Sequence, residues 1–192
     1  MKTQMIKKNK GFTLVETMFA IYILTFTIVG LMTVVANSLF AARYAKDEIT
    51  VNYLLQEVID YVRNDRDTTV FLEASAGSST WTNFLTKYNK CSTTDGCYFD
   101  VLPNILANYP IIQKNCPSSI CPFLYYNEKA TNTPFYVNGD GGGMLKTNFQ
   151  RKIVVKQNTN RDEVDVTVTV TWKNGGMLMN RSLSTSLMNW QK

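Results

Sequence analysis

The sequence predicts an α+β protein in which one long N-terminal helix packs on a C-terminal antiparallel β-sheet. Three observations predict this fold class: an apolar run near the N-terminus, a helical pattern that continues from it without proline, and a strict alternation of apolar and polar residues toward the C-terminus. Apolar residues recur every three or four positions in a helix and every second position in a strand. The two periods therefore separate the helical part of the chain from the sheet.

The apolar run covers residues 12–36, in which Glu16 is the only charged residue. A helix of this length covers roughly 37 Å, which is enough to cross a hydrocarbon core of about 30 Å. The basic residues before the run are Lys2, Lys7, Lys8 and Lys10, and the first one after it is Arg43. Because lysine and arginine accumulate on the cytoplasmic side, the bias predicts a cytoplasmic N-terminus and an exported body.

Glu16 is unusual because an acidic side chain inside an apolar segment is costly unless it has a partner. A small residue, Gly11, comes before the run, whereas a secretory signal has a shorter apolar core with its small residues after it. Cleavage after Gly11 would leave the helix attached and create an α-amino group on Phe12, one helical turn from Glu16. That amine, or the same amine of a neighbouring subunit, is the predicted partner. Such a pair fixes register more than it adds stability.

The motif Gly11-Phe12-Thr13-Leu14-Val15-Glu16 resembles the N-terminal motif of type IV prepilins, which type IV pilins share with the pseudopilins of type II secretion and competence systems. The resemblance implies that a prepilin peptidase cleaves between Gly11 and Phe12 and N-methylates Phe12. It also implies that Glu16 pairs with the Phe12 amine during assembly, with other pilin or pseudopilin subunits and an inner-membrane assembly platform as partners. The alternative is a plain signal-anchor helix with an incidental glutamate.

The chain is predicted to have four parts: a leader peptide (1–11), a transmembrane helix (12–36), an amphipathic continuation of that helix (37–64) and a globular head (65–192). The continuation carries an apolar stripe that needs a cover, and it predicts one helix from about Thr13 to Arg63. The predicted stripe comprises Leu39, Ala42, Lys46, Ile49, Tyr53, Leu55, Val58, Ile59 and Val62.

The head is predicted to contain a short helix over 81–88, two short strands over 123–126 and 134–137, a glycine-rich connection over 138–143, and three longer strands. The longer strands cover about 149–156, 164–172 and 183–187, and the last two are separated by a turn at Asn174-Gly175-Gly176. Their apolar face and the apolar stripe of the helix would bury each other, which is the reason for a helix-on-sheet head.

The four cysteines, Cys91, Cys97, Cys116 and Cys121, all lie in the part predicted to be exported. An even number of cysteines in an exported domain predicts disulfides. Three pairings are possible, and we favour the local ones, Cys91 with Cys97 and Cys116 with Cys121. A zinc site is the alternative, but the spacings do not fit the usual zinc motifs and the chain has no histidine.

The formal charge of +5 does not predict a nucleic-acid partner, because four of the basic residues lie in the leader and the remaining chain has 16 basic and 15 acidic residues. No catalytic constellation is visible, and we expect no enzymatic activity, cofactor or metal. The resemblance implies the pilin fold and a structural subunit that lies first in the bacterial inner membrane and then in an extracellular or periplasmic filament.

Within this family the chain is most similar to a minor pilin, with a role in filament initiation, adhesion or DNA uptake. Many major pilins have a proline in the membrane segment and a disulfide loop near the C-terminus. Here the membrane segment has Gly30 and no proline, and both cysteine pairs precede the predicted sheet. Two alternatives stay open: a pseudopilin of a type II secretion or competence system, and a membrane-anchored exported binding module that does not polymerise.

Overall fold

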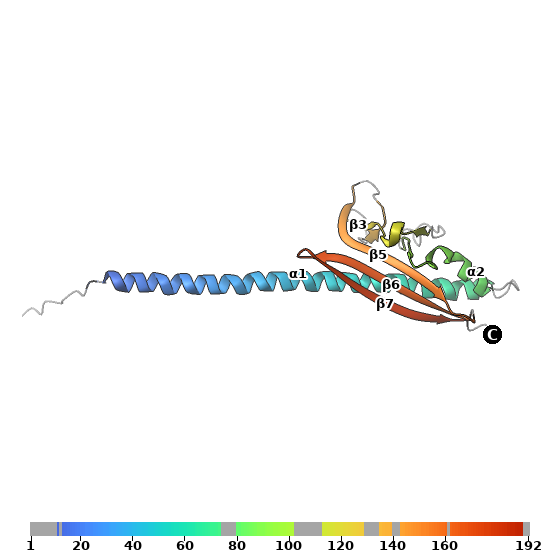
Figure 1. Cartoon of the computed structure of the whole chain (residues 1–192), viewed down its shortest axis with the longest axis horizontal. Helices are drawn as coiled ribbons and strands as arrows, with labels where there is room; N and C mark the ends of the chain where they lie inside the picture. Colours follow the sequence, from blue (N-terminus) through green and yellow to red (C-terminus); the bar gives the residue numbers. More distant parts are fainter. Residues whose placement is uncertain are drawn as a thin grey trace, which may run out of the picture. The chain divides into compact units, whose positions relative to one another are not determined.

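A computed structural model of the chain describes residues 11, 13–73, 80–101, 113–128, 135–139, 143–160 and 162–189. In chain order its elements are α1 (Leu14–Glu73), α2 (Thr80–Lys87), the 3-10 turn η2 (Asn89–Cys91), β1 (Cys97–Tyr98), β2 (Lys114–Asn115), the 3-10 turn η3 (Pro117–Ser119), β3 (Phe123–Asn127), β4 (Phe135–Val137), β5 (Leu145–Gln157), β6 (Glu163–Asn174) and β7 (Met177–Met188). The predicted α+β class, with one long N-terminal helix and a C-terminal antiparallel sheet, is confirmed (Figure 1).

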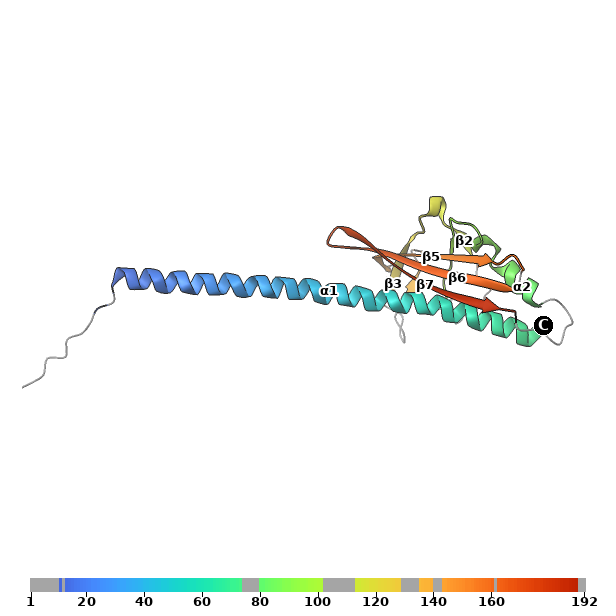
Figure 2. The same cartoon turned by 60° about the horizontal axis from the view of Figure 1, so that its bottom comes forward.

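The chain consists of two compact units, Met1–Lys46 and Asp47–Lys192, and α1 contributes residues to both. The second unit contains the sheet, α2 and the part of α1 that follows Lys46. In this unit β5, β6 and β7 lie alongside α1 in both views of the molecule (Figures 1 and 2). The hydrophobic core forms between the sheet and this part of the helix.

The seven strands that the described residues contain form one sheet, in which every pairing is antiparallel. β5 is its centre: β6 pairs along one edge, while β1 and β3 share the other edge, at Ile153 and at 145–150 respectively. β6 and β7 form a hairpin in which Asn174 pairs with Met177 across Gly175-Gly176. Both of these glycines have positive φ, as the tight turn predicted from the sequence requires.

Three of the predicted strands are longer than expected, and the two short strands of the head are confirmed as the β3–β4 pair. β1 and β2 were not predicted, because each has only two residues in a stretch rich in turn-forming residues. The predicted glycine-rich connection follows β4, where Asn138, Gly139 and Gly143 lie in bends, while 140–142 are outside the described residues.

The stripe predicted for the helix is partly wrong in phase. Ile49 and Tyr53 are exposed, whereas Val51 and Leu54, which the predicted stripe omits, are buried. The residues of α1 in the main hydrophobic core are Val51, Leu54, Leu55, Val58, Ile59 and Val62, a spacing of three and four that forms one helical face. This face packs on the inner face of β6, whose buried residues are Val164, Val166, Val168, Val170 and Trp172. Thr69 and Val70, nearer the end of the helix, are also buried.

The helix ends at Glu73 rather than near Arg63. Its additional turns are held by α2, the predicted short helix, through Lys87, whose Nζ donates to Thr69 Oγ1 at 2.8 Å and to Asp65 Oδ1 at 3.2 Å. Tyr88 adds a hydrogen bond from its hydroxyl to Asp65 Oδ2 at 3.0 Å. Because these partners come from a separate segment, the periodicity of the helix itself does not predict where it ends.

Candidate functional site

The first unit exposes an apolar surface on all sides of the helix. Every described side chain from 13 to 43 is exposed, and the large apolar ones between Leu14 and Phe40 are 49% to 75% exposed. Soluble monomers rarely expose apolar patches larger than a few hundred Å². A helix that is apolar all round is suited to complete burial rather than to packing along one stripe. This surface therefore needs a cover that surrounds it.

Among the described residues, α1 is the one helix that is long and apolar enough to cross a membrane, and its most apolar stretch has a mean hydropathy of 2.3. Threonine and serine hydroxyl groups in this part of α1 donate to backbone carbonyls of the same helix. Thr25 Oγ1 donates to the Tyr22 carbonyl at 2.9 Å, and Thr33 Oγ1 donates to the Gly30 carbonyl at 2.7 Å. Thr17, Thr27 and Ser38 make equivalent bonds at 2.8 Å. These side chains can therefore enter an apolar environment without losing their hydrogen bonds.

Glu16 lies in the first turn of α1 and has a structural role that the sequence interpretation did not include. Thr13 precedes the helix, and the backbone N–H of Glu16 donates to Thr13 Oγ1 at 3.3 Å and to the Thr13 carbonyl at 3.1 Å. A threonine followed three residues later by a glutamate is the pattern of a capping box. The signal was present in the sequence as Thr13-Leu14-Val15-Glu16. A carboxylate here also interacts favourably with the positive end of the helix dipole.

Gly11 is exposed, and a Cβ atom added to it would meet no atom within 4 Å. The fold therefore gives no steric reason for glycine at this position, so any requirement for it would come from outside the folded chain. Phe12, the predicted new N-terminus, lies outside the described residues. Of the residues predicted for processing and assembly, Gly11 and Glu16 are thus placed close together in the chain at the start of α1.

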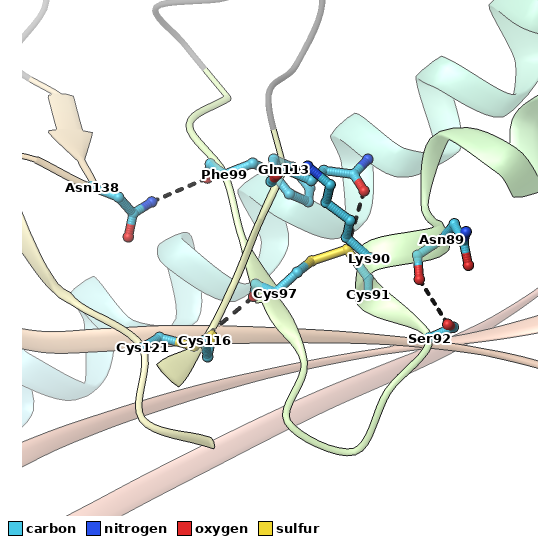
Figure 3. Close-up of a disulfide and its surroundings, with 10 residues drawn as sticks. All are labelled: Asn89, Lys90, Cys91, Ser92, Cys97, Phe99, Gln113, Cys116, Cys121 and Asn138. Atoms are coloured by element: carbon cyan, nitrogen blue, oxygen red, sulfur yellow. Dashed lines mark hydrogen bonds between the residues drawn. A yellow bond between two sulfur atoms is a disulfide. The ribbon is translucent and has the colours of Figure 1, made fainter. Parts of the chain in front are cut away.

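The four cysteines form the two predicted local disulfides in the second unit, Cys91 with Cys97 and Cys116 with Cys121 (Figure 3). The zinc alternative is therefore excluded for these residues, since all four sulfurs are already bonded. Both disulfides are buried. The two loops that they close lie next to each other, because Cys97 pairs with Asn115 in the β1–β2 ladder and the Cys116 N–H donates to the Gly96 carbonyl at 3.1 Å.

Gly96 shows why one of these loops has its conformation. Its φ is +72°, a region that favours glycine, and an added Cβ would lie 2.8 Å from the Ile153 carbonyl oxygen of β5. The loop between Cys91 and Cys97 therefore approaches the central strand more closely than any residue with a side chain allows. This arrangement is structural: one disulfide joins η2 to β1, and β1 pairs with β5 at Cys97 and Ile153, in a different unit from Gly11 and Glu16.

Among the described residues, no group of three or more histidine, cysteine, aspartate or glutamate side chains could hold a metal ion. Comparison with known proteins yielded no matching protein-family model, no matching curated protein and no matching solved structure.

Proposed function

We propose that this chain is a structural subunit of a type IV pilus-like filament, in the role of a minor pilin, whose N-terminal helix lies first in a membrane and then in the filament. The observation that carries the proposal is the apolar surface of 13–43, which is exposed on all sides. A bilayer covers such a surface, and so does a bundle of similar helices. The membrane covers this surface before the subunit is assembled, and the bundle of helices covers it in the filament.

A filament subunit and a simple membrane anchor make different demands on Glu16. A simple anchor gains from the Glu16 side chain only what a polar residue contributes to a capping box, because the backbone N–H that bonds to Thr13 is present in almost any residue at this position. Glutamine at the same position of a capping box serves equally well. A filament subunit also needs the negative charge, because the carboxylate pairs with the α-amino group that cleavage creates on Phe12. Hydrogen bonding and charge can therefore be separated by substitution.

The experiment compares Glu16→Gln, which keeps a side chain able to complete a capping box and removes the charge, with Glu16→Ala, which removes both. The bond from the backbone N–H of residue 16 to Thr13 is kept in both variants. The amount of chain in sheared extracellular filaments is measured relative to the amount in membranes. We expect both variants to be processed and inserted, and both to lose incorporation by about tenfold, which corresponds to about 1.4 kcal/mol. If Glu16→Gln assembles like the unmodified chain and only Glu16→Ala fails, helix capping explains the residue and charge pairing does not.

Cleavage is tested separately by mass spectrometry of the N-terminal peptide. We expect a methylated N-terminus at Phe12 and a block of processing in Gly11→Val, because a branched side chain would crowd a peptidase site. Gly30→Ala is the matched control, since an added Cβ meets no atom within 4 Å at either glycine. An uncut chain confined to membranes would overturn the proposal and indicate the anchored binding module. A methylated chain found only in the cell envelope would indicate a pseudopilin.

A further inference from the structure

The second unit contains a groove of about 460 Å³ between one face of α1 and the short strand β4. Its walls include Thr50, Tyr53, Glu57 and Asp60 from the helix, and Phe135 and Tyr136 from β4. Tyr53, Glu57 and Asp60 are spaced by four and three residues, so they lie on one helical face. This face is adjacent to the buried face of α1, and Tyr53 and Asp60 on it remain exposed beside β4.

The groove is acidic. Two of the described residues that line it are carboxylates, Glu57 and Asp60, and none is basic. The Asp60 side chain is 74% exposed, and its cationic neighbour Arg63 is 3.8 Å away, at the limit of an ion pair. Glu57 is ion-paired through Oε2 with Arg151 at 2.6 Å, and its Oε1 is buried without a hydrogen-bond partner among the described residues. The exposed carboxylate of Asp60 is therefore the negative charge that the groove offers to a ligand.

The remaining walls are aromatic. Tyr136 is held in place by ring contacts with Tyr126, at 5.2 Å between centroids, and with Phe149, edge-on at 6.3 Å. Burial raises the pKa of the Tyr136 hydroxyl above its usual value, and the nearby Tyr126 and Asp47 act in the same direction, whereas a hydrogen bond with Thr50 acts against them. Tyr53 faces the groove from the helix and is 69% exposed, so its ring is available to a ligand.

We propose that this groove binds a basic side chain of a partner polypeptide, with lysine or arginine as the ligand. The aliphatic stem of such a side chain can pack on the aromatic walls while its charged end remains near water and the carboxylates. A cation beside Tyr53 and Asp60 gains both a cation–π contact and an ion pair. This groove belongs to the second unit alone and is independent of the role proposed for the N-terminal helix.

The test uses the full chain in detergent micelles, labelled for NMR, and titrated with acetyl-Gly-Lys-Gly-amide or acetyl-Gly-Arg-Gly-amide. Acetyl-Gly-norleucine-Gly-amide is the matched neutral probe, because it has a similar stem without the charge. We expect saturable shifts at Tyr53, Phe135 and Tyr136 with the lysine or arginine peptide. We also expect weaker binding at high salt, since a solvent-exposed ion pair is screened.

Two variants identify the groove as the binding site. Tyr53→Ala and Asp60→Asn each remove an exposed group, and we expect each to weaken binding by about three- to tenfold. The matched controls are Phe71→Ala, which removes an aromatic ring that is 81% exposed on α1 outside the groove, and Asp67→Asn. Equal shifts with norleucine, unchanged binding in both groove variants, or no saturable shift with either cationic peptide would overturn the proposal.

Discussion

Arg151 on β5 and Glu57 on α1 form an ion pair inside the core of the second unit, with 2.6 Å between Arg151 Nη1 and Glu57 Oε2. The arginine is fully buried, whereas the glutamate side chain is 20% exposed. The guanidinium also donates to the carbonyl oxygens of Leu54 and Phe99, each at 3.3 Å. One side chain thus joins the helix, the central strand and the segment after β1.

Because Arg151 is buried and Glu57 is partly exposed, replacing one partner should lower the free energy of unfolding more than replacing the other. Glu57→Leu leaves a buried cation without its carboxylate and should lower the free energy of unfolding by about 3–5 kcal/mol. Arg151→Met should cost less, because the partly exposed Glu57 can regain contact with water. The double variant should recover most of the loss. The free energy of unfolding of all three variants is measured by urea unfolding, with tryptophan fluorescence as the signal.

The matched control for this prediction is the pair between Arg181 and Glu48, whose closest atoms are 3.1 Å apart. Its glutamate is 17% exposed, much like Glu57, but its arginine is 57% exposed, so the cation left by the substitution remains in water. Glu48→Leu should cost less than about 1 kcal/mol, as expected for a surface ion pair. Equal losses for Glu57→Leu and Glu48→Leu would contradict the buried role of Arg151.

Gly96→Ala should destabilise the second unit by more than a positive φ alone requires. The added Cβ would lie 2.8 Å from both the Ile153 carbonyl oxygen and Lys152 Cγ, and the backbone oxygen cannot move aside alone. Gly176→Ala is the control, because Gly176 has a φ of +87° and no atom within 4 Å of an added Cβ. Thermal unfolding should show a loss of about 1–2 kcal/mol for Gly176→Ala and a larger loss for Gly96→Ala. Equal losses would mean that the close approach to β5 has no energetic consequence.

Stability should fall as pH rises from 10 to 12, in part because of Tyr61. Burial, and then the charge of Asp65, raise the pKa of Tyr61 from 10.0 to about 12. The unfolded chain releases this proton at lower pH than the folded chain, so the stabilisation is complete below pH 10 and is lost as pH rises through 12. Tyr61→Phe should show a shallower loss over this window, measured by urea unfolding at several pH values. The two chains should have parallel profiles below pH 9, and parallel profiles up to pH 12 would refute the role of Tyr61.

The two disulfides should contribute unequally to stability. Each closes a loop of similar length, with sequence separations of 6 and 5, so the loop-entropy contribution is about 2 kcal/mol for each. Cys91 and Cys97 also belong to the main hydrophobic core, whereas Cys116 and Cys121 do not. Replacing the first pair by alanine should therefore lower the melting temperature more than replacing the second. The opposite order, or free thiols detected by alkylation without reductant, would contradict this assignment.

Features that depend on neighbours in the sequence were predicted correctly. The β6–β7 hairpin follows from alternation on either side of Gly175-Gly176, and both disulfides join cysteines a few residues apart. The capping pattern of Thr13 and Glu16 was also legible in the sequence, although only the structure drew attention to it.

Features that depend on distant segments were not predicted. The helix extends to Glu73 because Lys87 and Tyr88 of a later segment bind its last turns. The predicted buried face of α1 was out of phase because Ile49 and Tyr53 continue the helical period of apolar and aromatic residues, although both side chains are exposed. Alternation puts Arg151 on the same strand face as Phe149 and Ile153. Its partner Glu57 cannot be inferred in this way, since the two residues are far apart in the chain.

By itself, the sequence determined the apolar helix with its glycine and glutamate, the alternating strands and the two short disulfide loops, because each depends on the spacing of neighbouring residues. Only the tertiary structure decided which helical face is buried, how Arg151 is neutralised and where Glu57, Asp60 and Tyr136 form an acidic groove. Those outcomes depend on which segments meet in space, and local periodicity carries no information about that.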